Sequence, residues 1–257
     1  MKHTAMIFVA LLLSAIAGDS AIAQVIFSTG FSAAEGYVDG PLIGQPASGT
    51  QKWIDANPNV PADSFNVENE MLAIIGKGSG GKWALMPIPV QKGVFTMTWD
   101  WRFVGPENGV ADIGVCVSDS VIFEVVDGNP VPNYNEQGMM VRFYTGGVVE
   151  ARDGDWAGGG TYGALREVRY QDGKLLKVRV VIDASAWTFD VYITKEGESE
   201  ILLADDYGFR QAPSEETGGL NCIVIWDNGT ADMTGNGCTI DNLTLFGPAP
   251  VPHWSLY

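Results

Sequence analysis

The most regular alternation of apolar and polar side chains lies between Val94 and Val104. Every second position there is apolar: Phe95, Met97, Trp99, Trp101 and Phe103. The positions between them are polar: Thr96, Thr98, Asp100 and Arg102. Because successive side chains of a strand point to opposite faces, this pattern predicts a strand with one face in a core and one toward water. Both tryptophans are therefore assigned to the core rather than to a ligand-stacking surface.

The same period of two recurs in three further stretches, 139–144, 176–183 and 187–194. In the last of them the inward side is predicted to hold Trp187, Phe189, Val191 and Ile193. Shorter apolar runs predict additional strands, with 113–117 and 121–126 joined as a hairpin. Many short strands, frequent turn signals and no helical period predict an all-β antiparallel sandwich or barrel.

The chain divides into three parts. Residues 1–23 are predicted to be a signal peptide, because a short polar start and an apolar run from Ala5 to Ala17 precede a small-x-small site at Ala21–Ala23. Residues 24–247 are predicted to form one domain, and the proline-rich residues 248–257 an extended tail. The mature protein is therefore expected to be secreted, extracellular or periplasmic, without a membrane span.

The charge of the chain narrows the choice of partner. There are 31 acidic and 15 basic residues, for a net charge of −16. Such a field repels the phosphates of nucleic acids and anionic membrane surfaces, and it favours neutral or cationic ligands.

Cysteine and histidine positions limit the chemistry further. Cys222 and Cys238 lie close in sequence on two predicted strands and are expected to form a disulfide in an oxidising compartment, whereas Cys116 is expected to be a buried thiol. Both histidines, His3 and His253, fall outside residues 24–247. The domain therefore lacks the residue for histidine acid–base catalysis, a Ser-His-Asp triad or a typical zinc site.

Three stretches carry a resemblance to a known family. The stretch that begins at Val25 has the order F…Y..G.L.G, the hairpin from Lys174 to Ala204 contains W-x-F-D-V-Y, and Ile240 opens the closing strand I-D-N-L-T-L. In these features the chain resembles the concanavalin A-like, laminin-G-like jelly-roll superfamily in its secreted bacterial form. The resemblance implies two face-packed sheets, adjacent terminal strands and a sheet that is often concave.

Members of this superfamily include lectins, carbohydrate-binding modules, glycoside hydrolases, polysaccharide lyases and adhesive domains, so the fold does not select a function. The resemblance also implies a structural calcium ion near the terminal strands, with Glu35, Asp39 and Asp241 as its candidate oxygen ligands. The paired-glutamate strand E-x-D-x-x-E of the laminarinase-like hydrolases is absent. The corresponding strand offers only Asp100, where glycoside hydrolysis needs two carboxylates.

Polar and aromatic side chains on the outward faces of the predicted strands are the candidate ligand-binding residues. If these strands share one sheet, they form one strip: Asp100, Arg102, Arg142, Tyr144, Asp190 and Tyr192. Fixed donors, acceptors and aromatic faces of this kind bind sugars. The glycine-rich loop 155–163 adds Trp156 and Tyr162 as candidates for stacking on a ligand. The alternative is a solvated sheet face with cross-strand ion pairs.

Three functions stay open on these grounds. The favoured hypothesis is a non-catalytic, lectin-like domain that binds a polysaccharide or other glycan. The first alternative is an extracellular polysaccharide-degrading enzyme, above all a lyase that uses Tyr144 or Tyr192 with Arg102 or Arg142. The second alternative is an adhesive or matrix domain. The sequence does not determine the oligomeric state.

Overall fold

The computed structural model describes residues 24–46, 51–56, 64–75, 81–104, 112–126, 128–170, 173–228 and 237–247. The predicted signal peptide and the proline-rich tail lie outside these residues. Within them, no helix is both long and apolar enough to cross a membrane.

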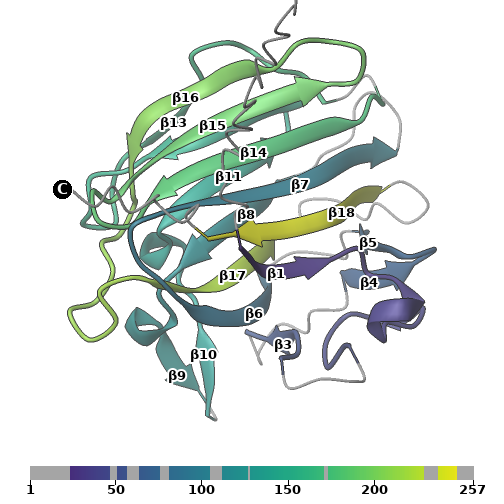
Figure 1. Cartoon of the computed structure of the whole chain (residues 1–257), viewed down its shortest axis with the longest axis horizontal. Helices are drawn as coiled ribbons and strands as arrows, with labels where there is room; N and C mark the ends of the chain where they lie inside the picture. Colours follow the sequence, from purple (N-terminus) through teal and green to yellow (C-terminus); the bar gives the residue numbers. More distant parts are fainter. Residues whose placement is uncertain are drawn as a thin grey trace, which may run out of the picture.

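Two antiparallel sheets form the fold (Figure 1). The nine-stranded sheet runs in the order β16 (Ile201–Gly208), β15 (Thr188–Lys195), β14 (Leu176–Asp183), β7 (Val94–Val104), β18 (Gly237–Phe246), β5 (Met71–Ile74), β4 (Phe65–Glu68) and β2 (Gly40–Pro41), with β1 (Val25–Thr29) also paired to β18. The seven-stranded sheet runs in the order β13 (Thr161–Gly163), β12 (Val148–Asp153), β11 (Met139–Tyr144), β8 (Ile113–Ser118), β17 (Leu220–Asp227), β6 (Lys82–Gln91) and β3 (Ile54–Asp55).

A small hairpin and three short 3-10 helices complete the described structure. The hairpin consists of β9 (Glu124–Val126) and β10 (Asn129–Val131). The 3-10 helices are η1 (Ala33–Glu35), η2 (Ser120–Ile122) and η3 (Tyr134–Glu136). The all-β, two-sheet architecture predicted from the sequence is confirmed. The expected pairing of the terminal strands is also present, since β1 runs antiparallel to β18.

Strand β7 lies inside the nine-stranded sheet, between β14 and β18, and the alternation that defines it is confirmed. All five apolar side chains expected to face inward are at most 2% exposed: Phe95, Met97, Trp99, Trp101 and Phe103. The polar positions between them are half-buried or exposed on the outer face. The two tryptophans of β7 therefore belong to the core between the sheets.

Aromatic stacking joins the two sheets at the centre of this core. Trp101 of β7 lies parallel to Phe143 of β11, with ring centroids 3.6 Å apart and 9° between the ring planes. Tyr170 meets Trp101, Phe103 and Phe143 edge-on. Its hydroxyl donates a hydrogen bond of 2.6 Å to the carbonyl of Tyr144. This cluster fixes the register of one sheet over the other.

A second apolar cluster covers part of the outer face of the seven-stranded sheet. Its large members are Trp83 and Trp226, whose ring centroids are 5.9 Å apart. The Trp226 indole lies against Gly114, where an added Cβ would come within 1.7 Å of Nε1. Cys116 and Cys222 are buried in the same cluster. This part of the outer face is therefore apolar, whereas the outer face of β7 is polar.

The structure corrects two local predictions. The stretch 121–126 does not form a hairpin with 113–117. Asp119 accepts a hydrogen bond from the backbone N–H of Val121 and caps η2, so that the chain leaves the sheet before β9. Strand β8 pairs instead with β11 and β17.

The predicted disulfide is the second correction. Cys222 faces outward from the seven-stranded sheet, while Cys238 lies in the core on the nine-stranded sheet. Cys222 lies on β17 and Cys238 on β18, strands of different sheets, so the two side chains are on opposite faces of the seven-stranded sheet. All three cysteines are free and buried.

The central stack yields a test of stability. Replacement of Phe143 by alanine removes a fully buried ring from the Trp101 stack and is expected to lower the free energy of unfolding by about 3–5 kcal/mol. Tyr144→Ala is the matched control, because the next side chain on the same strand is 37% exposed and its loss is expected to cost about 1 kcal/mol or less. Urea unfolding measures both values, and similar losses would contradict the role of the stack.

Candidate functional site

The single strip of candidate ligand-binding residues is divided between two surfaces. Asp100 and Arg102 on β7, and Asp190 and Tyr192 on β15, belong to the nine-stranded sheet. Strand β11, with Arg142 and Tyr144, pairs with β8 and β12 in the seven-stranded sheet. The condition that these strands share one sheet is therefore wrong. The period of each strand places its side chains correctly, but strand order depends on contacts between distant parts of the chain.

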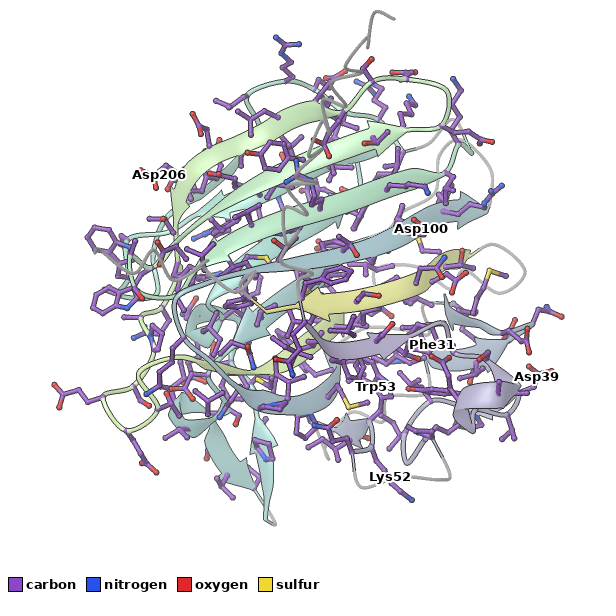
Figure 2. The ribbon with its side chains drawn as sticks, viewed as in Figure 1. Phe31, Asp39, Lys52, Trp53, Asp100 and Asp206 are labelled. Atoms are coloured by element: carbon purple, nitrogen blue, oxygen red, sulfur yellow. The ribbon has the colours of Figure 1, made fainter. Side chains whose placement is uncertain are left out.

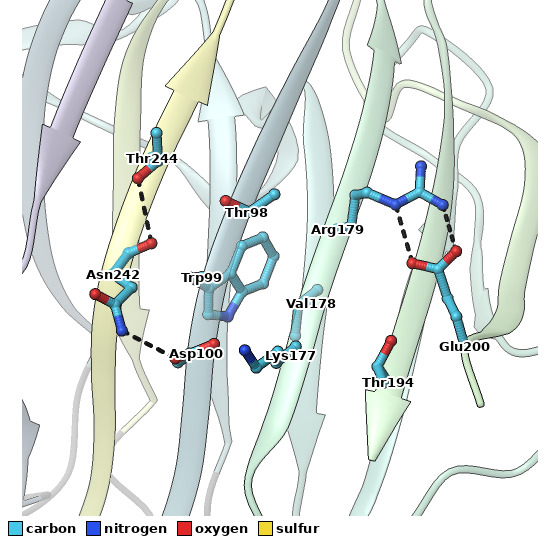
Figure 3. A pocket seen from close by; sticks show the side chains of 10 residues that line it. All are labelled: Thr98, Trp99, Asp100, Lys177, Val178, Arg179, Thr194, Glu200, Asn242 and Thr244. Atoms are coloured by element: carbon cyan, nitrogen blue, oxygen red, sulfur yellow. Dashed lines mark hydrogen bonds and ion pairs between the residues drawn. The ribbon is translucent and has the colours of Figure 1, made fainter. Parts of the chain in front are cut away.

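A polar groove of about 410 Å³ lies on the outer face of the nine-stranded sheet, over β7, β14 and β18 (Figure 3). Its polar lining comes from these three strands, from the end of β15 and from the connection between β15 and β16: Thr98, Asp100, Lys177, Arg179, Thr194, Glu200, Asn242 and Thr244. Hydroxyl, carboxylate, amide and cationic groups are thus gathered in one hollow. Of the predicted ligand-binding residues, Asp100 alone is among those that line it.

One side of the groove is fixed by an irregularity in β18. The pairing of β18 with β7 shifts register between Asp241 and Thr244, and Asn242 adopts a left-handed backbone with φ of 51°. Asparagine tolerates this conformation better than most residues. The shift turns the Asn242 amide toward β7, where Nδ2 donates a hydrogen bond of 2.9 Å to Asp100 Oδ2. The Thr244 hydroxyl donates to the Asn242 carbonyl at 3.4 Å.

The other side is fixed by an ion pair. Arg179 donates two hydrogen bonds to the Glu200 carboxylate, of 3.0 Å from Nε and 2.5 Å from Nη2 (Figure 3). The guanidinium also lies 3.8 Å above the centroid of the Tyr192 ring. This pair lowers the pKa of Glu200 and raises that of Arg179, so both groups are charged at neutral pH. Tyr192 thus acts as a support beneath Arg179.

The remaining candidates on this sheet do not line the groove. Arg102 is exposed on the outer face of β7, opposite Thr239 of β18. Asp190 accepts a hydrogen bond of 2.8 Å from the backbone N–H of Asp206 and holds the irregular pairing of β15 with β16. Desolvation and the neighbouring Asp190 raise the pKa of Tyr192, so its phenol stays protonated at neutral pH.

Arginine and tyrosine side chains stack on the outer face of the seven-stranded sheet. The Arg142 guanidinium lies 3.5 Å from the ring centroid of Tyr162 and 4.0 Å from that of Tyr144. It is also bound to Glu150 at 2.6 Å. The Tyr162 hydroxyl accepts a hydrogen bond of 2.6 Å from Tyr134, and burial raises its pKa. The structure therefore brings Arg142, Tyr144 and Tyr162 together, with Arg142 already engaged on both sides.

The two tryptophans of the polar loops form an exposed pair. Trp156 is 49% exposed and Trp187 is 40% exposed, and their ring centroids are 6.4 Å apart at an angle of 65°. The assignment of Trp187 to the core is wrong, because β15 begins only at Thr188 and Trp187 has a left-handed backbone with φ of 60°. Trp156 is accessible, as stacking on a ligand requires.

Acidic groups surround a hollow of about 600 Å³ beside the terminal strands, lined in part by Glu35, Glu70, Asp241 and Asn242. Glu35 Oε2, Asp241 Oδ1 and Asn242 Oδ1 all lie within 4.0 Å of the point where a Cβ on Gly30 would stand. Asp39 does not line the hollow and accepts a hydrogen bond from the backbone N–H of Asn69. Among the described residues, no three acidic, histidine or cysteine side chains are arranged to hold a metal ion.

Several residues of the groove are not evident from the sequence. The alternation places Lys177 and Arg179 outward on their strand, but it does not reveal that they are neighbours of Asp100. Glu200 follows the hairpin turn, and Asn242 occupies the bulge within the closing strand. The Asp-Asn pair in an otherwise alternating strand is the signal that could have indicated the bulge, because both residues favour irregular backbone.

Comparison with known proteins identifies the fold. The sequence matches no protein-family model and no curated protein. Solved structures with the same arrangement include lectin I-B4 from Griffonia simplicifolia in its metal-free form, with a TM-score of 0.52, 13% identity, and coverage of 81% of this chain and 98% of the lectin. The protein has the concanavalin A-like jelly-roll fold.

Two further solved structures show the same fold. The exoplasmic/lumenal domain of VIP36, solved with Ca²⁺ and Man3GlcNAc bound, gives a TM-score of 0.54 and 13% identity over 83% of this chain and 90% of that domain. Lectin II from Ulex europaeus gives a TM-score of 0.53 and 8% identity over 86% of this chain and 97% of the lectin. At such identities the similarity establishes the jelly roll and no particular ligand.

The acidic hollow predicts how the stability of the protein depends on pH. Burial and the charges of Asp100, Glu35 and Glu70 raise the pKa of Asp241. The folded state thus binds this proton more tightly than the unfolded chain, and ionised Asp241 destabilises the fold until the pH falls through its raised pKa. Asp241→Asn is expected to stabilise the protein at pH 7 in a chelating buffer, by less than about 1 kcal/mol after screening.

This gain should shrink as the pH is lowered from 7 through the raised pKa of Asp241, where the carboxyl takes up its proton. Thermal unfolding of both proteins across this range measures the difference. Asp39→Asn serves as the control, because Asp39 lies outside the lining of the hollow. A gain for Asp241→Asn that is constant with pH, or that is equalled by Asp39→Asn, would show that the repulsion among these carboxylates is negligible.

Proposed function

We propose that the protein is an exported, non-catalytic, lectin-like domain that binds a glycan in the polar groove of the nine-stranded sheet. The observation that carries this proposal is the lining of the groove: Thr98, Asp100, Lys177, Asn242 and Thr244 present hydroxyl, carboxylate, ammonium and amide groups toward one hollow. Export is supported by the signal-peptide pattern in residues 1–23.

The groove suits sugar hydroxyls because its polar groups are held in place before a ligand arrives. Asn242 is bonded to Asp100, and Glu200 is bonded twice to Arg179, so few rotamers must be frozen on binding. A hydroxyl group both donates and accepts, and therefore matches a surface in which carboxylates alternate with cationic and amide donors. The lectin structures that share the fold add support, since VIP36 has been solved with Man3GlcNAc bound.

Binding is favoured over a lyase reaction by the state of the tyrosines. A lyase with a tyrosine base needs that tyrosine to be accessible and to lie beside an arginine that neutralises the substrate. Tyr192 has a raised pKa and supports an arginine that is paired with Glu200. Arg142, the arginine next to Tyr144, is paired with Glu150. Each arginine is thus already neutralised by a glutamate and is poorly placed to neutralise a substrate. Glycan binding in the groove is therefore better supported than proton abstraction by either tyrosine.

Asp100→Ala tests the site. Loss of a charged hydrogen-bond acceptor is expected to weaken glycan binding by about 1.5–3 kcal/mol, or roughly tenfold or more. Arg102→Ala is the matched control, because Arg102 lies two residues further on the same strand and face but does not line the groove. A glycan array identifies a ligand, and calorimetry then compares the variants.

Two results would contradict the proposal: equal loss in both variants, or no binding to a broad panel of neutral and acidic glycans. Formation of unsaturated sugar ends during incubation with polyuronates would contradict the absence of catalysis.

Calcium is a further part of the proposal. Carboxylate and amide oxygens are the ligands that Ca²⁺ prefers, and Glu35, Glu70, Asp241 and Asn242 line the same hollow. Glu35 already accepts hydrogen bonds from Gly30 and Ser32, so a bound ion would rely mainly on Asp241 and Glu70, with Asn242 and water completing the shell. Bound Ca²⁺ would remove the repulsion that raises the pKa of Asp241.

Addition of millimolar Ca²⁺ is expected to raise the melting temperature, because the ion binds the folded state alone. Asp241→Asn should lose most of this increase, while Asp39→Asn should keep it, because Asp39 does not line the hollow. An increase that Mg²⁺ reproduces would indicate general screening of charge. No increase at all would exclude this calcium site.

A further inference from the structure

Trp156 and Trp187 form an exposed pair that does not line the glycan groove. The groove is lined by Thr194 and Glu200 at the far end of β15, whereas Trp187 directly precedes the first residue of that strand. Each of the two tryptophan residues is at least 40% exposed, although tryptophan is usually well buried. The two ring planes are inclined at 65°, so the pair presents two surfaces at an angle rather than one flat surface.

A single buried residue holds both tryptophans in place. Phe209 is fully buried, its backbone N–H donates to the Trp187 carbonyl at 2.8 Å, and its carbonyl accepts from the Trp156 N–H at 3.0 Å. Gly208 lies against the Trp156 indole, where an added Cβ would stand 3.2 Å from Nε1. The pair is therefore arranged in advance of any ligand, which reduces the entropic cost of binding.

Both tryptophans also have left-handed backbones, with φ of 66° at Trp156 and 60° at Trp187. This conformation is unfavourable for residues other than glycine and, when it occurs at an exposed site, points to a function. An aspartate in each turn accepts hydrogen bonds from the backbone. Asp155 accepts from Ala157 and Gly159, and Asp183 accepts from Ser185 and Ala186.

The segments that carry the pair have one sign of charge. Residues 153–159, 183–190 and 204–209 contain no lysine or arginine, and their acidic residues are Asp153, Asp155, Asp183, Asp190, Asp205 and Asp206. The adjoining arginines, Arg152 and Arg210, lie over the rings of Tyr162 and Tyr134, and their Nε atoms donate hydrogen bonds to the carbonyls of Gly159 and Gly158. Six aspartates against these two arginines leave the segments with a net negative charge. Hydrogen bonds from Ala157 and Gly159 lower the pKa of Asp155, which keeps it ionised in mildly acidic solution. Aromatic faces within a negative field attract organic cations.

We propose that Trp156 and Trp187 form a second binding site, which takes the protonated amino group and adjoining ring of an amino sugar, as in a de-N-acetylated polysaccharide. The site rests on the proposed glycan-binding function and adds the class of sugar. One indole would cover the apolar face of the pyranose ring, and the other would contact the ammonium group. The surrounding aspartates favour the charged sugar over its N-acetylated form.

Calorimetry with glucosamine oligomers and with fully N-acetylated oligomers of the same length tests the proposal. The glucosamine oligomers are expected to bind more tightly, and this preference should decrease as salt is added, because exposed charges are screened. Trp156→Ala and Trp187→Ala should each weaken glucosamine binding by about two- to fivefold. Leu165→Ala is the control, because Leu165 is an apolar side chain that is 55% exposed elsewhere on the surface.

Two further variants remove a charge without disturbing the fold. In Asp155→Asn, the amide oxygen of the new side chain can still accept the hydrogen bonds of the turn. In Asp206→Asn, asparagine tolerates the left-handed backbone of this position, where φ is 54°. Both substitutions are expected to weaken binding of the glucosamine oligomer by up to about fivefold and to leave binding of the N-acetylated oligomer unaffected.

The outcomes separate this site from the groove. If Asp100→Ala weakens binding of a neutral glycan while the tryptophan variants weaken binding of the glucosamine oligomer alone, both sites are supported. Equal affinity for charged and N-acetylated oligomers, or tryptophan variants that bind the glucosamine oligomer normally, would overturn the second site. The proposed glycan binding in the groove would be unaffected by either result. Tighter binding of a lysine oligomer than of a glucosamine oligomer of equal charge would overturn the sugar assignment, because a basic peptide would then be the better ligand.

Discussion

The contact between Trp101 and Phe143 is the constraint on which the rest of the structure depends. These two rings come from different sheets and lie parallel at 3.6 Å, with Tyr170 closing the cluster from the side. Because the stack fixes one sheet over the other, the inward faces of β7 and β11 pack in the core. The side chains between the inward positions must then point outward, with Asp100 on one side of the sandwich and Arg142 on the other.

The two outer faces then differ in character. On the nine-stranded sheet, polar side chains in neighbouring strands pair with one another and leave a hollow between Asp100, Lys177 and Asn242 (Figure 3). On the seven-stranded sheet, Trp226 packs against Gly114 and Trp83, and arginines stack on tyrosines. Figure 2 shows Asp100 on the broad face of the nine-stranded sheet and Asp206 near one edge of the sandwich. The region around Asp206 and the polar groove are thus separate.

Prediction from the sequence succeeded where the physics is local. The alternation in β7 correctly divides Trp101 from Asp100, because side-chain direction in a strand follows from the position of the residue alone. It failed where contacts between distant residues, or irregular backbone, determine which strands are neighbours and which way a side chain points. Strand order separates Arg142 from Arg102, and the Cys222–Cys238 prediction failed because β17 and β18 belong to different sheets. Trp187 continues the apolar alternation in sequence, but its left-handed backbone turns it out of the strand.

The central claim is that a glycan binds to the outer face of the nine-stranded sheet. A crystal structure of the protein with a bound oligosaccharide tests it most directly. The account predicts that sugar hydroxyls contact Asp100, Lys177 and Asn242, with Arg179 and Glu200 still paired at the side of the groove. An oligosaccharide bound instead beside Arg142 and Tyr144, on the seven-stranded sheet, would contradict the claim.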